Sequence, residues 1–197
     1  MIFIFDLFGV TLRWNSNEVL PYWARLAGVS VEQYKRETRA DFEACECGKI
    51  SMAELWERNG KKFGVKPSEL KAIFLKRFVK RAKLNEAVVK IIKDAGKHGK
   101  VFLMSNQWPA HAEVCRKKGW FDVFDRVFLS FELGARKPDK AAYHAVLKRI
   151  RAKPGDCVLI DDKERNVKGA VSIGMHAILF KSARQLRRDL EKLFNLG

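Results

Sequence analysis

The sequence predicts an α/β protein in which a parallel, doubly wound sheet carries an inserted block of helices. From residue 84 onward, short apolar runs alternate with stretches whose apolar residues recur at helical spacing. This alternation is typical of parallel strands joined by crossover helices. The segment 14–83 contains no run that resembles a strand. We therefore predict a core domain formed by residues 1–13 and 84–197, and an all-helical cap domain formed by residues 14–83.

The chain begins with a buried strand that runs into an acidic residue. The apolar stretch "MIFIF" leads directly to Asp6, and Gly9 follows shortly after. A carboxylate at the end of a buried strand costs free energy unless another group pairs with it. Asp6 is therefore the first candidate functional residue.

The inserted segment is expected to form helices that pack around aromatic residues. These helices are predicted in the stretches 17–28, 31–44, 51–64 and 67–82. The segment carries Trp14, Trp23 and Trp56, which we expect to pack mainly in the core of the cap.

Strands and helices alternate regularly after the insertion. Strands are predicted in the stretches 100–106, 126–130, 156–162 and 176–180, and helices in the stretches 85–96, 109–119, 138–150, 165–174 and 182–194. Pro138 is expected in the first turn of its helix, where its missing N–H does no harm. Ser182 is a candidate N-cap for the last helix.

Polar residues gather where the predicted strands end. These residues are Asp6, Ser105, Asn106, Ser130, Asp161 and Asp162, with Lys137 in the loop after Ser130. Ligands of open α/β sheets bind beyond the carboxyl ends of the strands. Adjacent carboxylates suit Mg²⁺, a lysine and a hydroxyl can hold phosphoryl oxygens, and a carboxylate can act as a nucleophile. Together they favour phosphoryl transfer, which depends on positioning and charge neutralisation.

Four motifs in this order resemble the haloacid dehalogenase (HAD) superfamily: "IFDLFGV", "FLMSNQ", "ELGARKPDKAAYHAVL" and "VLIDDKERNVKGAVSIGM". The layout is similar to the branch with a helical cap inserted after the first motif, and to small sugar-phosphate phosphatases of the alpha-glucose-1-phosphate phosphatase type. The resemblance implies a HAD-like Rossmannoid core. It also implies a Mg²⁺-dependent phosphatase that acts on a small phosphorylated metabolite through an aspartyl-phosphate intermediate.

The resemblance also implies a role for each residue of the set. Asp6 would attack phosphorus, Ser105 and Asn106 would bind the substrate, and Lys137 would neutralise the nucleophile and the phosphate. Asp6, the Phe8 backbone carbonyl, Asp161 and Asp162 would hold Mg²⁺, with Asp162 as a direct ligand and Asp161 assisting. In enzymes of this kind the cap contacts the substrate, so the resemblance also makes Arg13, Trp14, Trp23 and Arg39 candidate substrate contacts.

The first motif departs from most phosphatases of the family, which have a second aspartate where Phe8 stands. That aspartate protonates the leaving group and later activates water, and a phenylalanine can do neither. Dehalogenases of the superfamily have an aromatic residue here and a tyrosine six residues after the lysine, where this chain has Tyr143. They lack the acids that stand here as Asp161 and Asp162, so a phosphatase is favoured. The alternatives are a 2-haloacid dehalogenase-like hydrolase and a catalytically weak HAD-like protein that binds phosphorylated ligands or nucleic acid.

Composition limits the remaining possibilities. The formal net charge is +16, spread over both halves of the chain, which favours general attraction of phosphates over a dedicated nucleic-acid module. No apolar run is long enough to span a bilayer and the start lacks the features of a signal peptide, so we expect a cytoplasmic protein without membrane contact. His111 is expected on a helix surface. The oligomeric state is not readable from the sequence.

Overall fold

The computed structural model describes residues 1–194 and has a parallel five-stranded sheet at its centre, with the strand order β5-β4-β1-β6-β7. The strands are β1 (Ile2–Phe5), β4 (Lys100–Ser105), β5 (Arg126–Leu129), β6 (Cys157–Asp161) and β7 (His176–Leu179). Phe5 pairs with Leu103 on one side and with Ile160 on the other. The carboxyl ends of β1, β4 and β6 therefore meet at one edge, and the α/β fold class predicted from the sequence is confirmed.

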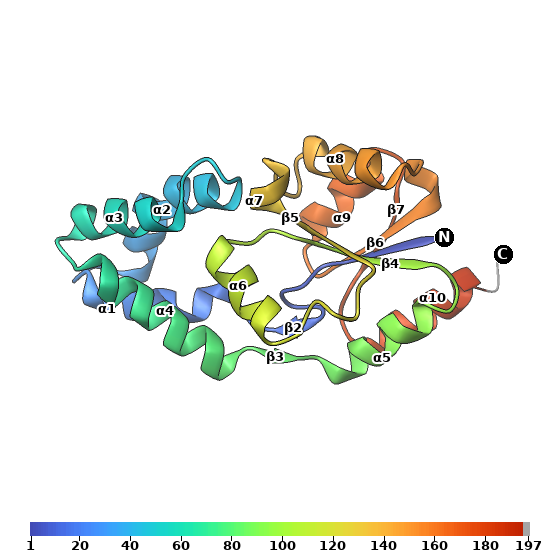
Figure 1. Cartoon of the computed structure of the whole chain (residues 1–197), viewed down its shortest axis with the longest axis horizontal. Coiled ribbons are helices and arrows are strands. Elements are labelled where there is room, and N and C mark those ends of the chain that lie inside the picture. Colours follow the sequence, from blue (N-terminus) through green and yellow to red (C-terminus); the bar gives the residue numbers. More distant parts are fainter. Residues whose placement is uncertain (195–197) are drawn as a thin grey trace.

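Helices cover both faces of this sheet (Figure 1). They are α5 (Glu86–Ala95), α6 (Pro109–Lys117), α7 (Ser130–Leu133), α8 (Lys140–Ile150), α9 (Glu164–Val171) and α10 (Ala183–Phe194), with a 3-10 turn η2 (Pro154–Asp156). Because successive strand residues point to opposite faces, Phe3 and Phe5 pack in one apolar cluster with residues of α5, α6 and α10. Ile4 packs in a second cluster with residues of α8 and α9.

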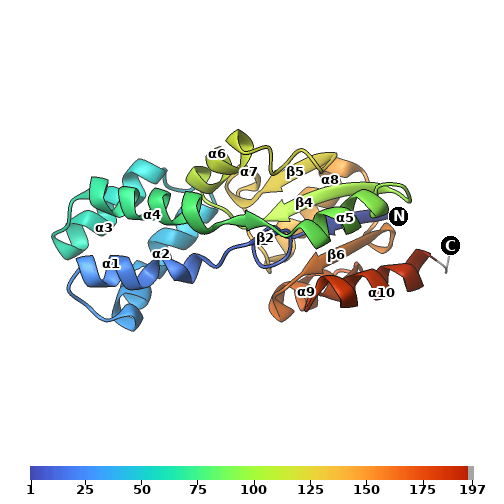
Figure 2. The same ribbon diagram turned by 90° about the horizontal axis from the view of Figure 1, so that it is seen from below.

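The segment between the first strand and α5 forms helices, as the sequence predicts. They are η1 (Ser16–Glu18), α1 (Leu20–Leu26), α2 (Val31–Glu46), α3 (Met52–Phe63) and α4 (Pro67–Arg81). Ser30 and Ser51 cap α2 and α3 by accepting hydrogen bonds from backbone amides of the first turn. Figures 1 and 2 show α1–α4 grouped beyond the carboxyl ends of the strands.

Aromatic side chains form the centre of this helical group, in line with the expectation for the tryptophans. The buried Trp23 ring stacks on Phe42 with ring centroids 5.5 Å apart and meets Trp56 edge-on at 5.6 Å. Its indole N–H donates to the Leu70 carbonyl at 2.9 Å, which satisfies the polar atom that burial would otherwise leave unpaired.

Three local features differ from the sequence predictions. Two-residue strands, β2 (Leu12–Arg13) and β3 (Lys83–Leu84), pair antiparallel where the chain enters and leaves the helical group; no such strands were expected. Pro138 lies before α8 and not in its first turn, because Asp139 is extended and α8 begins at Lys140. Ser130 begins α7 and does not end β5. Ser182 caps α10 as predicted, accepting from the Gln185 amide at 3.2 Å.

None of the helices within residues 1–194 is long and apolar enough to cross a membrane.

Candidate active site

A buried lysine joins the carboxyl ends of three neighbouring strands. The Lys137 side chain is 1% exposed, and its Nζ donates to Asp6 Oδ1 at 2.9 Å, to Asp161 Oδ2 at 2.6 Å and to the Met104 carbonyl at 2.7 Å. These bonds use all three ammonium protons. Burial lowers the pKa of Lys137, but the charges of Asp161 and Asp6 outweigh it and hold that pKa above its usual range. Lys137 is therefore a fixed positive charge at the edge of the sheet.

Asp6 is the carboxylate at the end of the first strand, and the structure buries it almost completely at 3% exposure. Burial raises the pKa of Asp6 to about 6; Lys137 opposes this effect, while Asp161 adds to it. The Asp6 backbone is held as well, since its N–H donates to the Ile160 carbonyl and its carbonyl accepts from Thr11 Oγ1. The acid has the pairing that its burial requires, and it stands in a cluster where negative charge exceeds positive charge.

The two consecutive acids at the carboxyl end of β6 have different surroundings. Both carboxylate oxygens of Asp161 are engaged, by Lys137, by the Lys163 amide and by the Asn166 side chain. Asp162 Oδ1, in contrast, is buried and has no hydrogen-bond partner. Burial raises the pKa of Asp162 as well. Asp161 therefore positions Lys137, and Asp162 retains an oxygen that can take a ligand.

A glycine allows the first loop to approach Asp162. Gly9 has a φ of +84°, and a Cβ atom added to it would lie 2.3 Å from Asp162 Oδ2. Any side chain at this position would meet both an unfavourable backbone conformation and a steric clash. The requirement for glycine thus has a local cause, which is the packing of the first loop on the carboxylate.

The residues present fit a divalent cation. Asp6, Asp161 and Asp162 each offer a carboxylate oxygen, and these oxygens lie within 4.8 Å of one another. The buried Asp162 Oδ1 lacks a partner. In the loop after β1, the Leu12 amide donates to the Leu7 carbonyl and the Gly9 amide donates to the Leu12 carbonyl. Neither bond uses the carbonyl oxygen of Phe8. Oxygen ligands of this kind suit Mg²⁺.

The loops after β4 and β5 hold the cluster in place. The Asn106 side chain donates to the Lys137 carbonyl at 2.8 Å and accepts from the Lys137 amide at 2.9 Å. Ser130 Oγ accepts from the Gln107 amide at 3.0 Å. Ser105 Oγ is buried without a partner. Of these predicted site residues, Ser105 keeps its polar atom available, whereas the Asn106 amide is engaged in fixing the backbone of Lys137.

The Phe8 side chain points into an aromatic cluster. It is 9% exposed, and its ring lies 6.2 Å from the Phe78 ring on α4 and 4.9 Å from the His111 ring on α6. His111 is itself 2% exposed, so the expectation of a surface histidine is wrong. The reason is that α4 packs over the first turn of α6, a contact that the periodicity of α6 alone does not reveal.

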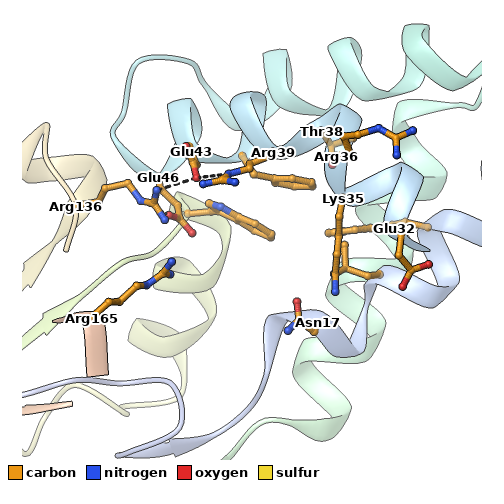
Figure 3. Close-up of a pocket in the computed structure, with 14 residues that line it drawn as sticks. Asn17, Glu32, Lys35, Arg36, Thr38, Arg39, Glu43, Glu46, Arg136 and Arg165 are labelled. Atoms are coloured by element: carbon orange, nitrogen blue, oxygen red, sulfur yellow. Dashed lines mark hydrogen bonds and ion pairs between the residues drawn. The ribbon is translucent and has the colours of Figure 1, made fainter. Parts of the chain in front are cut away.

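A cleft of about 900 Å³ lies between the helical group and the sheet edge (Figure 3). It is lined by Asn17, Leu20, Trp23, Glu32, Lys35, Arg36, Thr38, Arg39, Phe42, Glu43, Glu46, Trp108, Arg136 and Arg165. Two of the expected cap contacts, Trp23 and Arg39, line this cleft, whereas Arg13 and Trp14 do not. Arg13 instead reaches Asn85, and Trp14 packs against Phe78.

Sequence reasoning assigned no partner to Arg136 and missed other residues of the cleft. Arg136 forms ion pairs with Glu43 at 3.1 Å and Glu46 at 2.9 Å on α2, so it joins the helical group to the loop of Lys137. Arg165 was not singled out, although it stands next to Asn166 in the last motif. Phe42 and Trp108 carry no motif, and their role depends on how α2 meets the loop before α6.

Comparisons with known proteins place this geometry in a family. The model of the haloacid dehalogenase-like hydrolases matches residues 1–174. The sesquiterpene phosphatase astK of Aspergillus oryzae is 28% identical over 174 residues, which cover 87% of this chain and 85% of that protein. The drimenol cyclase drtB of Aspergillus calidoustus is 38% identical over 97 residues, 48% of this chain but 18% of the cyclase.

A solved structure shows the same fold. A HAD family enzyme from Bacteroides thetaiotaomicron, crystallised with magnesium and inorganic phosphate, matches with a TM-score of 0.76 at 22% identity. The match covers 91% of this chain and 93% of that one.

Proposed function

This chain belongs to the haloacid dehalogenase-like hydrolases, and we propose that within this family it is a Mg²⁺-dependent phosphatase that hydrolyses a small phosphate monoester through an aspartyl-phosphate on Asp6. One observation carries the proposal. A buried lysine pairs with Asp6 and Asp161, while Asp162 Oδ1 and Ser105 Oγ at the same sheet edge are buried without partners. The named activity of the related sesquiterpene phosphatase supports the same reaction.

Each residue then has a chemical task. A carboxylate oxygen of Asp6 attacks phosphorus, and the bond from phosphorus to the ester oxygen breaks. Lys137 Nζ offsets the charge that gathers on Asp6 and the phosphoryl oxygens, and the Ser105 hydroxyl donates to one of those oxygens. Water then attacks the aspartyl-phosphate, which releases inorganic phosphate and restores Asp6. Asn106 keeps the lysine in place through the Lys137 backbone.

The metal would be held by Asp6, the Phe8 carbonyl and Asp162, with Asp161 assisting. When bound, Mg²⁺ supplies positive charge that neutralises the phosphoryl oxygens and lowers the repulsion among the three acids. Phe8 contributes its backbone only, so no side chain of the first motif donates a proton to the leaving oxygen. The departing alkoxide takes its proton from water.

Two observations weigh against a dehalogenase. The Tyr143 hydroxyl donates to the Asn166 carbonyl at 2.8 Å, and Tyr143 is 1% exposed in the core; this arrangement serves packing. Asp161 and Asp162 would repel the carboxylate of a haloacid in the absence of a metal. With a divalent cation, the same acids favour a phosphate ester.

The decisive experiment measures phosphate release from a panel of esters with Mg²⁺ and after chelation, for wild type and Asp6→Asn. We expect activity only with metal and only in wild type, and a mass gain of one phosphoryl group on Asp6 after rapid quenching. Asp122→Asn, at an exposed acid far from the cluster, is the matched control and should keep full activity. Activity that survives in Asp6→Asn would exclude Asp6 as the nucleophile, and metal binding without turnover would favour a non-catalytic phosphate binder.

A further inference from the structure

The cleft between the helical group and the sheet edge is lined on its core side by sequence neighbours of the acid–lysine cluster, here defined as Asp6, Lys137, Asp161 and Asp162. Its core wall is built from the loops that carry the cluster. Trp108 follows shortly after Ser105, Arg136 directly precedes Lys137, and Arg165 directly precedes Asn166, which hydrogen-bonds Asp161. These neighbours place the cleft on the side of the site loops, where the rest of an ester whose phosphate is held at the cluster would lie.

The interior of the cleft is aromatic. Phe42 of α2 stacks on Trp23 of α1 at 5.5 Å and on Trp108 of the core loop at 4.8 Å between ring centroids. Leu20 extends this wall. Phe42 and Trp108 thus contribute rings to one surface, with the fully buried Trp23 ring behind them; we call this surface the aromatic wall and define it as Leu20, Trp23, Phe42 and Trp108.

The lining offers little to a sugar. Its neutral polar side chains, apart from the indoles, are Asn17 and Thr38, and the Thr38 hydroxyl already donates to the Tyr34 carbonyl at 2.7 Å. Several charged side chains pair with each other, since Glu43 accepts from Arg39 at 3.0 Å and from Arg136 at 3.1 Å. Apart from charged side chains such as Glu32, Lys35 and Arg36, the cleft offers a polyhydroxylated group few partners for the hydrogen bonds that it loses to water.

The cations of the cleft are suited to the phosphate end of a ligand. Arg165 is exposed and, within residues 1–194, makes no ion pair with an acidic side chain. Figure 3 shows its guanidinium directed into the cleft below Arg136 and Glu46. Arg165 and Arg136 therefore belong to the core side of the cleft, whereas the aromatic wall is formed by α1, α2 and the residue before α6.

We propose, resting on the phosphatase function above, that the substrates are monophosphate esters of a large apolar alcohol. The phosphate occupies the acid–lysine cluster beside Arg165, and the apolar group lies on the aromatic wall. Burial of one methylene changes binding by about 4-fold, which corresponds to about 0.8 kcal/mol. The preference should therefore grow with chain length until the wall is covered.

The test uses n-alkyl phosphates from ethyl to decyl, below their micellar concentrations, because their leaving groups have nearly the same acidity. With Mg²⁺ present, kcat/KM should rise by about two- to fourfold per methylene over the first several carbons, and glucose 6-phosphate should resemble ethyl phosphate. Phe42→Ala should lower the decyl-to-ethyl ratio by about tenfold or more. Phe63→Ala is the matched control, at a half-buried ring that stacks on Tyr34 outside the cleft, and should leave the ratio unchanged.

Failure of this inference is distinguishable from failure of the phosphatase proposal. Equal kcat/KM along the series, or a preference for glucose 6-phosphate, overturns the apolar substrate class while phosphatase activity stands. A decyl-to-ethyl ratio that Phe42→Ala leaves intact overturns the aromatic wall as its cause. If no ester is hydrolysed, calorimetry compares the affinity of the wild type for decylphosphonate with its affinity for ethylphosphonate. Tighter binding of the decyl compound supports the inference, and equal binding overturns it.

Discussion

The burial of His111 makes stability sensitive to acid in a way that one substitution can isolate. The His111 ring packs against the rings of Phe74, Phe78 and Trp108 as well as Phe8, with centroids 4.7–4.9 Å away. Neither ring nitrogen has a hydrogen-bond partner. Burial lowers the pKa of His111 from 6.5 to about 3. The folded protein therefore holds this imidazole neutral, while the unfolded chain binds a proton at any pH below 6.5.

The sign and size of the effect follow from this difference. Because the unfolded state binds more protons between the two pKa values, the free energy of unfolding falls as pH decreases below 6.5. With about 1.36 kcal/mol per pKa unit, the loss is about 2 kcal/mol at about pH 5 and approaches about 5 kcal/mol at about pH 3. At neutral pH the residue contributes no such loss.

The assay is urea unfolding of wild type and His111→Phe at about pH 7.5 and about pH 5. His111→Phe keeps an aromatic ring at this position. When the pH is lowered from about 7.5 to about 5, its free energy of unfolding should fall by about 2 kcal/mol less than that of wild type. His144→Gln, at an exposed histidine of α8, controls for the removal of an imidazole and should behave as wild type. An equal fall in wild type and His111→Phe would refute the claim that His111 is buried in its neutral form.

Three further predictions concern the acid–lysine cluster and its first loop. Asp6→Asn should raise the free energy of unfolding of the metal-free protein at about pH 7.5 by up to about 3 kcal/mol. Burial raises the pKa of Asp6 from 3.8 to about 6, so the ionised carboxylate destabilises the folded state above this range. Denaturant titration checks this, and a loss of stability in the variant contradicts it. Gly9→Ala should weaken Mg²⁺ binding in calorimetry because its Cβ would strike the Asp162 carboxylate, whereas Gly28→Ala, with a similar φ of +66° and nothing within 4 Å, should bind normally. Phe8→Asp should raise the turnover of alkyl phosphates by up to ~10²–10⁴-fold. It should also destabilise the fold by about 3 kcal/mol or more, since it removes a packed ring. A wild-type rate that does not depend on the pKa of the leaving group, together with no gain in the variant, would show that another group supplies the proton.

The sequence predicts the sheet and its edge well, because the required signals are local. An apolar run that ends in a polar residue marks both a strand and its carboxyl end, as for Asp6 and Ser105. Parallel pairing then brings such ends together without further information. The short distances around Lys137 are consistent with that reasoning.

Other features depend on contacts between segments that are far apart in the chain. His111 is buried by α4, and Arg136 is paired by acids of α2, so neither outcome follows from the neighbouring residues. The two-residue strands β2 and β3 are too short to produce a pattern. Asn106 carries a side chain suited to a phosphate, and only the position of the Lys137 loop shows that its amide is already engaged.

The packing of Phe8 connects the chemistry of the first loop to the helical group above it. Its backbone follows Asp6 at the sheet edge, while its ring contacts Phe78 of α4 and His111 of α6. An aspartate at this position would place a carboxylate among these rings, where burial would raise its pKa and oppose the charged form. Phenylalanine at this position thus forms an apolar contact between cap and core, and it offers no carboxyl group that could protonate a leaving group. An enzyme built in this way should favour leaving groups that need little protonation, and the rate of each ester should be set by the acidity of its alcohol together with the fit of that alcohol to the aromatic wall.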